Sequence, residues 1–178
     1  MHPWKLDTAH TAVGFTAKHM MVSRVRGLFS GITGSLDFDE ANPTASTVQV
    51  VIPAASIETG MAPRDAHLRS ADFLDAEQFP TLTFASTAVK PQGDHWVITG
   101  DLTMHGITRP VALEAETLGV VTGSDGRRHA GFEAHAKIKR SDWGLTWNKS
   151  LEAGGWLVSD DITIDLDVAA DELAAVTA

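Results

Sequence analysis

The chain has 178 residues, a length that suits one domain, and residues 1–178 are expected to form a single domain. It contains no cysteine, which excludes disulfides, thiolate nucleophiles and cysteine-ligated metals. Its formal net charge of −9 disfavours binding to nucleic acid and to anionic membrane surfaces, because both attract basic proteins.

The start of the chain and its hydropathy indicate a soluble protein. Residues 1–7 contain no charged stretch followed by the apolar run of a secretory leader. No segment reaches the roughly 18 consecutive apolar residues of a membrane-spanning helix. We therefore expect a cytoplasmic protein as the chain stands, and a periplasmic or exported one if a leader has been removed.

Alternation of apolar and polar residues is the main structural signal, and it is typical of strands with one buried face. Turn-forming residues separate most of these segments and favour short connections between antiparallel neighbours. The eight strand-like segments are Val13–Ala17, Leu28–Phe38, Val48–Ile52, Leu82–Phe84, Trp96–Met104, Ile107–Ala115, Phe132–Ile138 and Ile162–Val168.

Two stretches interrupt this alternation. Residues 19–26 are expected to form an irregular link or a single helical turn. Residues 63–73 predict a helix, because Pro63 suits a first helical turn and Asp65 suits the positive end of the helix dipole. The predicted fold class is therefore all-β, with eight antiparallel strands and one short helix near one end.

Strands of this kind form either a two-sheet sandwich or a closed barrel. Small inward residues favour the barrel, because a packed sandwich would fill such positions with large side chains. An eight-stranded barrel can hold one ligand in the space they leave. The alternative, in which large residues on the opposite wall fill that space, stays open. The small inward residues are Ala17, Gly34, Ala88, Gly100, Ala115, Ala134 and Ala136.

The sequence contains none of the common motifs for catalysis or phosphate binding, and we expect no enzyme and no cofactor. The eight histidines raise the question of a metal site. His10, His19, His67 and His105 lie at predicted strand ends or on the helix, where they could share a rim. Scattered surface imidazoles are the expected arrangement, and no metal site is predicted.

The segment around the predicted helix has features of a lid. Helical spacing makes Arg64, Leu68 and Asp72 neighbours on one face and pairs Asp65 with Arg69. In one interpretation, a salt-bridged helix covers one end of the barrel as a plug. In the other, it is a polar lid in which Arg64, His67 or Arg69 contacts the head group of a ligand.

Several motifs along the chain, taken in this order, resemble the YceI-like family over essentially the whole length. Residues 100–111 match the signature G-x-L-T-x-x-G-x-T-x-P-V, and residues 138–144 match I-x-R-x-D-[FW]-G. Other matching residues are Trp4–Asp7, Arg64-Asp65, His67-Leu68, Asp72-Phe73 and Phe79-Pro80. The loop of Leu145–Lys149 and Leu151–Trp156 is individual to this chain, either as a packing cluster at the rim or as a ligand mouth.

The resemblance implies a lipocalin-like antiparallel barrel whose apolar tunnel takes a polyisoprenoid chain, in a family that often forms dimers. It also implies transport, storage or handling of isoprenoid or quinone lipids, frequently under stress. Many relatives are periplasmic and carry a leader, and this chain departs from them there. A barrel with a filled interior, acting as a scaffold or dimerising interaction module, is the alternative.

Strand parity and the resemblance together predict which residues contact the lipid. Those expected along the tunnel and at its ends are Phe15, Ala17, Leu36, Phe38, Val50, Ile52, Phe73, Phe79, Phe84, Ile98, Leu102, Leu113, Phe132, Ala134, Ala136, Ile138 and Trp143.

Overall fold

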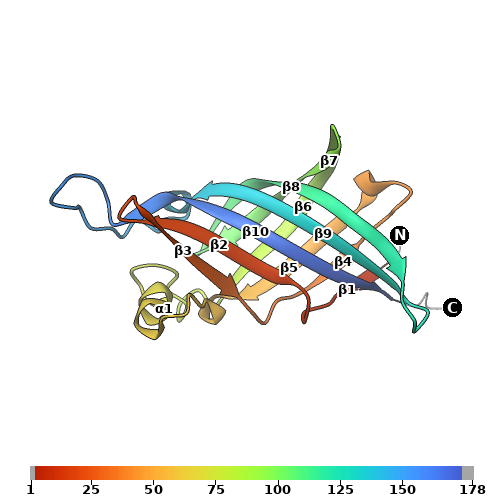
Figure 1. Ribbon diagram of the computed structural model, residues 1–178, viewed down its shortest axis with the longest axis horizontal. Helices are drawn as coiled ribbons and strands as arrows, with labels where there is room; N and C mark the ends of the chain where they lie inside the picture. The colour runs from red at the N-terminus through yellow and green to blue at the C-terminus, as the bar shows by residue number, and fades with distance from the viewer. Residues whose placement is uncertain (1–2, 174–178) are drawn as a thin grey trace.

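The structure is a computed structural model that describes residues 3–173, most of which lie in antiparallel strands (Figure 1). The strands are β1 (Pro3–Leu6), β2 (Ala12–His19), β3 (Ser23–Phe29), β4 (Thr33–Asp37), β5 (Thr47–Pro53), β6 (Thr81–Gln92), β7 (His95–Met104), β8 (Ile107–Thr122), β9 (Arg128–Lys139) and β10 (Val158–Glu172). The helices are α1 (Ala62–Arg69) and three 3-10 turns, η1 (Pro43–Ala45), η2 (Ala54–Ser56) and η3 (Arg140–Trp143). Among these described residues, no helix has the length and apolar character needed to cross a membrane.

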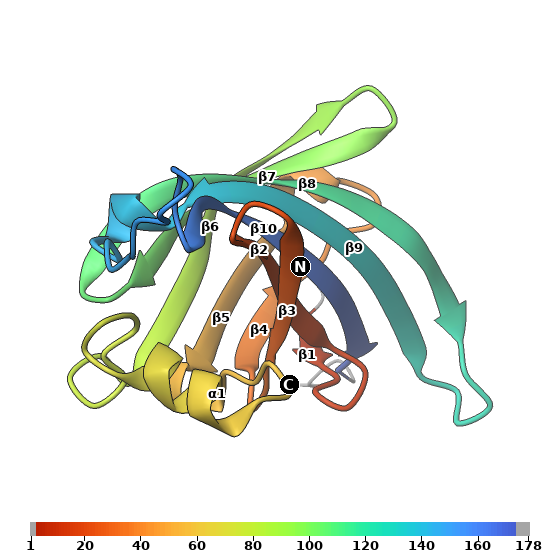
Figure 2. The ribbon, with the colours of Figure 1, turned by 60° about the vertical axis from the view of Figure 1, so that its left-hand side comes forward.

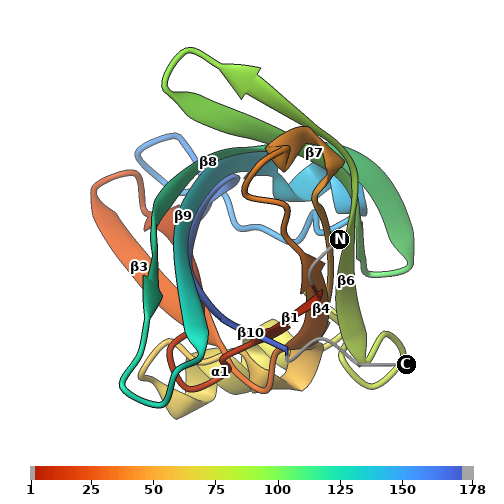
Figure 3. The same ribbon diagram turned by 90° about the vertical axis from the view of Figure 1, so that its right-hand side faces the viewer.

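Eight of the strands close into a barrel. Their order around the ring is β1, β4, β5, β6, β7, β8, β9 and β10, and β10 pairs again with β1. Figure 3 looks into this ring, with strands on all sides. The all-β fold class, with eight antiparallel barrel strands and one short helix, is confirmed.

The long strand β10 closes the barrel and also carries an additional hairpin. Along one edge it pairs with β9, and along the other it pairs first with β2 and then with β1. Because β2 also pairs with β3, the β2–β3 hairpin extends the wall at one end of the barrel. On its outer edge, β3 forms one isolated antiparallel bridge, between Leu28 and Glu58 of the segment before α1.

The prediction for residues 19–26 was wrong. Strand β2 runs on to His19, a tight turn follows, and β3 begins at Ser23. The inward side of β3 offers only Val25 and Gly27 before Phe29, so its apolar alternation is too weak to read as a strand. Gly27 is suited to this place because the Phe15 ring from β2 occupies the space of its missing side chain.

The predicted segment Leu28–Phe38 is divided between two strands. β3 ends at Phe29 and β4 begins at Thr33, with Gly31 between them in the left-handed region (φ +66°) that glycine adopts without steric cost. The division matters for the ring, since β3 stays outside it and β4 joins it.

Helix α1 is shorter than the predicted residues 63–73. It ends at Arg69, because Ser70 has an extended backbone and its hydroxyl donates to the His67 carbonyl oxygen at 2.6 Å. The chain then continues through turns to Leu74. Phe73 and Leu74, which follow the helix, are buried against the barrel core, so this segment covers one end of the barrel (Figure 2).

The other end of the barrel has a small apolar cluster of its own, made of Trp4, Phe38, Ala130 and Ala170. The Trp4 indole N–H donates to the Phe38 carbonyl oxygen at 3.3 Å, and the Phe38 and Phe132 rings pack edge to face at 5.0 Å. The interior of the barrel therefore lies between two packed ends.

Candidate functional site: the barrel interior

The barrel encloses a cavity of about 310 Å³, which is within the size range of small-molecule sites. Its wall draws on every strand and on Leu68 of α1, and apolar side chains make up most of it. Because successive side chains of a strand point to opposite faces, each strand lends the cavity alternate residues, as Leu113 and Ala115 of β8 illustrate. The site is therefore a property of the whole barrel.

Most of the residues predicted to contact a lipid lie in this wall. They are Phe15, Ala17, Leu36, Phe38, Val50, Ile52, Phe73, Phe84, Ile98, Leu102, Leu113, Phe132, Ala134 and Ile138.

Three of the predicted residues lie outside the wall. Trp143 is buried behind it, where its indole N–H donates to the Leu102 carbonyl oxygen at 3.0 Å. Phe79 packs on the His105 ring at 4.9 Å, and Ala136 packs against the core cluster.

Five of the seven small residues expected to face inward fall into two groups. Ala17, Ala115 and Ala134 lie in the cavity wall, and Ala115 and Ala134 face one another across β8 and β9. Gly100 instead lies under the Phe84 ring, and Gly34 lies against the backbone of Gln49. A small residue at an inward position thus leaves cavity space in the first group and makes room for a neighbouring residue in the second.

Arg140 brings a positive charge into the mostly apolar wall, and its side chain is buried. Its guanidinium donates to the carbonyl oxygens of Ser159 (2.9 Å), Leu145 (2.6 Å) and Trp147 (2.9 Å), and burial lowers its pKa. The other charged wall residue, Glu116, is exposed. Sequence reasoning noted Arg140 only as part of a motif, although it shares inward parity with Ile138.

An aromatic cluster lies beside Arg140 at the α1 end of the cavity. The Arg140 guanidinium carbon is 5.9 Å from the centre of the Phe73 ring. That ring also packs against His67 at 5.0 Å and Trp147 at 5.2 Å. The loop before β10 therefore contributes Trp147 to packing at the rim.

The three head-group candidates, Arg64, His67 and Arg69, lie beside the cavity and not in its wall. Arg64 donates to the Thr59 hydroxyl at 2.6 Å, and Arg69 donates to the Ile57 carbonyl oxygen at 2.8 Å. His67 contacts Asp72 at 2.8 Å and packs on Phe73, which does line the cavity. His67 is thus linked to the wall through Phe73.

Buried Asp65 holds the α1 segment together. Its carboxylate accepts from the Thr59 N–H at 2.8 Å and from the Thr59 hydroxyl at 2.5 Å, and the hydroxyl bond is the main cause of its lowered pKa. Arg64 binds the same threonine. Thr59, which precedes the helix, therefore fixes the first turn of α1.

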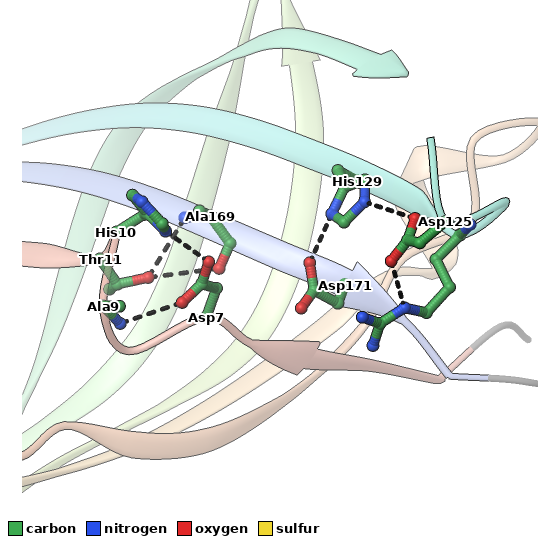
Figure 4. Close-up of polar contacts among 9 residues, drawn as sticks. Asp7, Ala9, His10, Thr11, Asp125, His129, Ala169 and Asp171 are labelled. Carbon is green, nitrogen blue, oxygen red and sulfur yellow. Dashed lines mark hydrogen bonds and ion pairs between the residues drawn. The ribbon is translucent and has the colours of Figure 1, made fainter. Parts of the chain in front are cut away.

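A polar cluster lies at the far end of β9 and β10 (Figure 4). His129 bridges Asp171 at 2.6 Å and Asp125 at 3.5 Å, and the bond to Asp171 raises its pKa. The Arg127 backbone N–H, helped by the Arg127 side chain, lowers the pKa of Asp125 to about 2. Across residues 3–173, no group of three or more histidine and acidic side chains is arranged to hold a metal ion.

The four histidines considered for a shared rim have separate surroundings in the fold. His10 pairs with Asp7 at 2.6 Å, and His67 pairs with Asp72. The ring of His105 contacts the Trp143 carbonyl oxygen at 3.1 Å, and His19 lies at the end of β2.

The fold and its cavity define an antiparallel β-barrel protein with an apolar interior. The sequence profile of the YceI-like domain matches residues 4–170. The chain therefore belongs to the YceI-like family.

Relatives agree with this assignment. Protein YceI of Salmonella newport (strain SL254) is 46% identical over 145 residues, which cover 80% of this chain and 76% of that protein. The crystal structure of the Campylobacter jejuni YCEI protein is 37% identical, with a TM-score of 0.76 over 94% of this chain and 96% of that one. A polyisoprenoid binding domain from Saccharophagus degradans has a TM-score of 0.66 over 97% of this chain and 100% of that one, and at 14% identity it shares the fold.

Proposed function

We propose that this protein binds a long apolar isoprenoid-type lipid inside the barrel and acts as a carrier or store for it, without catalysis. The observation that carries this proposal is the cavity inside the barrel, to which every strand contributes apolar side chains. A domain of the same fold is described as polyisoprenoid binding, which supports the same class of ligand.

The physical basis of binding is burial of the prenyl chain. Each methylene withdrawn from water contributes about 0.8 kcal/mol, so affinity should rise with every isoprene unit that the cavity can hold. Once the chain exceeds the cavity, further units stay in water and the gain should stop. The wall offers few hydrogen-bonding groups, so shape and length select the ligand.

The polar head of such a lipid would lie at the α1 end. Arg140 adds positive charge there, and His67 is joined to the wall through Phe73. Arg64 and Arg69 lie on the same helix, although both already donate to residues 57–59. An anionic head group would therefore be favoured over a neutral one of the same chain length.

Blocking the cavity tests the proposal directly. Ala134 lies in the wall and is 6% exposed, so Ala134→Trp should fill the cavity and abolish binding of a fluorescent apolar probe and of a polyprenol. The matched control is His135→Trp, one residue along β9 on the outer face. The control should bind like the unmodified protein.

Two results would count against lipid binding. One is equal binding by Ala134→Trp and His135→Trp when both variants keep the β-sheet circular dichroism of the parent. The other is protein from its natural host that carries no lipid in native mass spectrometry and takes up no polyprenol. Tight dimerisation without any uptake would favour the scaffold alternative.

A further inference from the structure

One end of the barrel exposes a group of large apolar side chains. They belong to the turn between β2 and β3, where Met21 is 66% and Val22 is 88% exposed, and to Trp156 in the loop before β10, which is 60% exposed. The two segments lie side by side at the left of Figure 1. The Met20 N–H donates to the Leu157 carbonyl oxygen at 2.8 Å, and the Met21 sulfur lies against Gly155. We call Met20, Met21, Val22 and Trp156 the apolar tip.

The backbone of the turn does not explain these residues. Met20 (φ 50°) and Met21 (φ 63°) are both in the left-handed region, which asparagine and glycine adopt far more readily than methionine. The Val22 N–H closes the turn on the His19 carbonyl oxygen at 3.2 Å. Folding alone would favour Asn-Gly here, so the two methionines conflict with the local turn preference. Conflicts of this kind are expected at functional surfaces.

The charges around the apolar tip are opposite to those of the whole chain. Lys18 and Arg24 face each other across the hairpin next to the turn, and Arg26 follows on β3. Lys149 lies in the neighbouring loop, and Glu152 is the one acidic residue within 18–26 and 148–157. Among the described ion pairs, which reach from residue 7 to residue 172, none involves these four cations. A chain of net charge −9 thus has a basic collar around its apolar tip.

The apolar tip stands at the end of the cavity where Arg140 lies. Val158, two residues after Trp156, is in the cavity wall, and so is Ala17, two residues before His19. Leu157, whose carbonyl oxygen accepts the hydrogen bond from the Met20 N–H, lies between Trp156 and Val158 along the chain. Insertion of the apolar tip into an apolar phase would therefore bring this end of the cavity next to that phase.

We propose that the apolar tip and its basic collar dock on the surface of an anionic phospholipid bilayer, and that the lipid ligand passes between bilayer and cavity there. Methionine, valine and tryptophan side chains enter the boundary of head groups and acyl chains, and the lysine and arginine side chains meet the lipid phosphates. The docking itself stands on the tip and the collar; the passage of a lipid rests on the function proposed above.

Vesicle flotation tests the docking with the whole protein. We expect it to float with vesicles of phosphatidylcholine and phosphatidylglycerol at low salt, and to float poorly with phosphatidylcholine alone or at high salt, because salt screens the collar. The double variant Met20→Asn/Met21→Gly gives the turn its preferred residues, so the fold stays intact. Its binding to the anionic vesicles should fall by at least about tenfold, because two buried apolar side chains are lost.

The matched control is Leu118→Asn/Val121→Asn, which removes two exposed apolar side chains near the opposite end of the barrel, 61% and 65% exposed against 46% and 66% for Met20 and Met21. This control should float like the parent, and Lys18→Gln/Arg24→Gln should float less. Docking is overturned if the parent does not bind anionic vesicles or if the turn variant floats as well as the parent. It is also overturned if the turn variant and the Leu118→Asn/Val121→Asn control lose binding equally. A tip-dependent dimer that ignores vesicles would also overturn it.

A second measurement separates this inference from the proposed function. Uptake of a fluorescent polyprenol is followed once from anionic vesicles and once from an ethanol dispersion without vesicles. The turn variant should take up the probe from the dispersion but lose uptake from vesicles. A parent protein that loads from the dispersion and ignores vesicles overturns the docking alone; one that binds vesicles but loads from neither source overturns the lipid-binding function alone.

Discussion

The Phe84 ring occupies the space where Gly100 would carry a side chain. A Cβ added to Gly100 would lie 2.6 Å from Phe84 Cε2 and 2.6 Å from the Ala85 carbonyl oxygen. Phe84 itself lines the cavity, so the glycine on β7 fixes the position of a wall residue on β6.

Gly100→Ala should therefore destabilise the barrel by about 1–3 kcal/mol, the usual cost of overpacking a core. The control is Gly131→Ala, because a Cβ at Gly131 would make an ordinary contact with the Leu118 Cβ at 3.5 Å. Urea denaturation measures both. Equal stabilities of the two variants would show that the Phe84 ring can move aside without a loss of folding free energy.

Arg140→Met should destabilise the protein by roughly 2–4 kcal/mol, because the buried carbonyl oxygen of Leu145 and the partly buried one of Trp147 lose their donor. The control is Arg109→Met, since Arg109 is exposed and gives one bond, to the Asp142 carbonyl oxygen at 3.2 Å. Its loss should cost less than about 1 kcal/mol. If chemical denaturation gave similar values for both, the anchoring role of Arg140 would be wrong.

Asp65→Ala should loosen the α1 segment while the barrel strands stay protected. The carboxylate is the shared acceptor for the Thr59 N–H and hydroxyl, so the start of the helix loses its attachment. Hydrogen exchange should become faster in residues 59–69 and lipid release should become faster with it. Asp72→Ala, which removes an exposed partner of His67, is the control and should leave both rates near those of the parent. Unchanged exchange in Asp65→Ala would contradict this assignment.

The stabilising effect of His129 should depend on pH. The bond to Asp171 raises its pKa above the ordinary value of 6.5, so the folded state binds the proton more tightly than the unfolded chain. The contribution is complete below about pH 6.5 and is lost as pH rises through the raised pKa. The Tm difference between the parent and His129→Asn should therefore be largest in mild acid and shrink in alkali. In an Asp171→Asn background this pH dependence should diminish. A Tm difference that stayed the same at every pH would refute the coupling between His129 and Asp171.

Much of the fold could be predicted from alternation because most barrel strands bury one face. The β2–β3 hairpin could not, since its inward side is short and contains Gly27, whose place is filled by Phe15 from the paired strand. Strand β1 also escaped prediction, because four residues with buried Trp4 and Leu6 are too few to establish a period. Strand β1 pairs with β4 and β10, which lie far away in sequence, whereas β3 pairs with its neighbour β2 and was missed because its own alternation is weak.

The cavity wall could largely be predicted because inward parity and wall position coincide for most strands. Parity does not separate the inner wall from the layer behind it, which is why Ala136 was included with the wall residues. Trp143 was expected to close one end of the tunnel and is instead buried behind the wall. It also does not say whether an inward glycine faces open space or a neighbouring ring, as at Gly100. The apolar tip escaped notice because residues 19–26 were not read as a hairpin.

The course of β10 has a consequence for synthesis of the protein. This last strand pairs with β9 on one side and with both β2 and β1 on the other, so Phe15 meets Ile164 and Leu6 meets Ala170. The first strands of the chain must therefore wait for the last before they gain those partners. Closure can occur only after β10 has emerged from the ribosome, and until then the apolar faces of the nascent sheet stay open to chaperones.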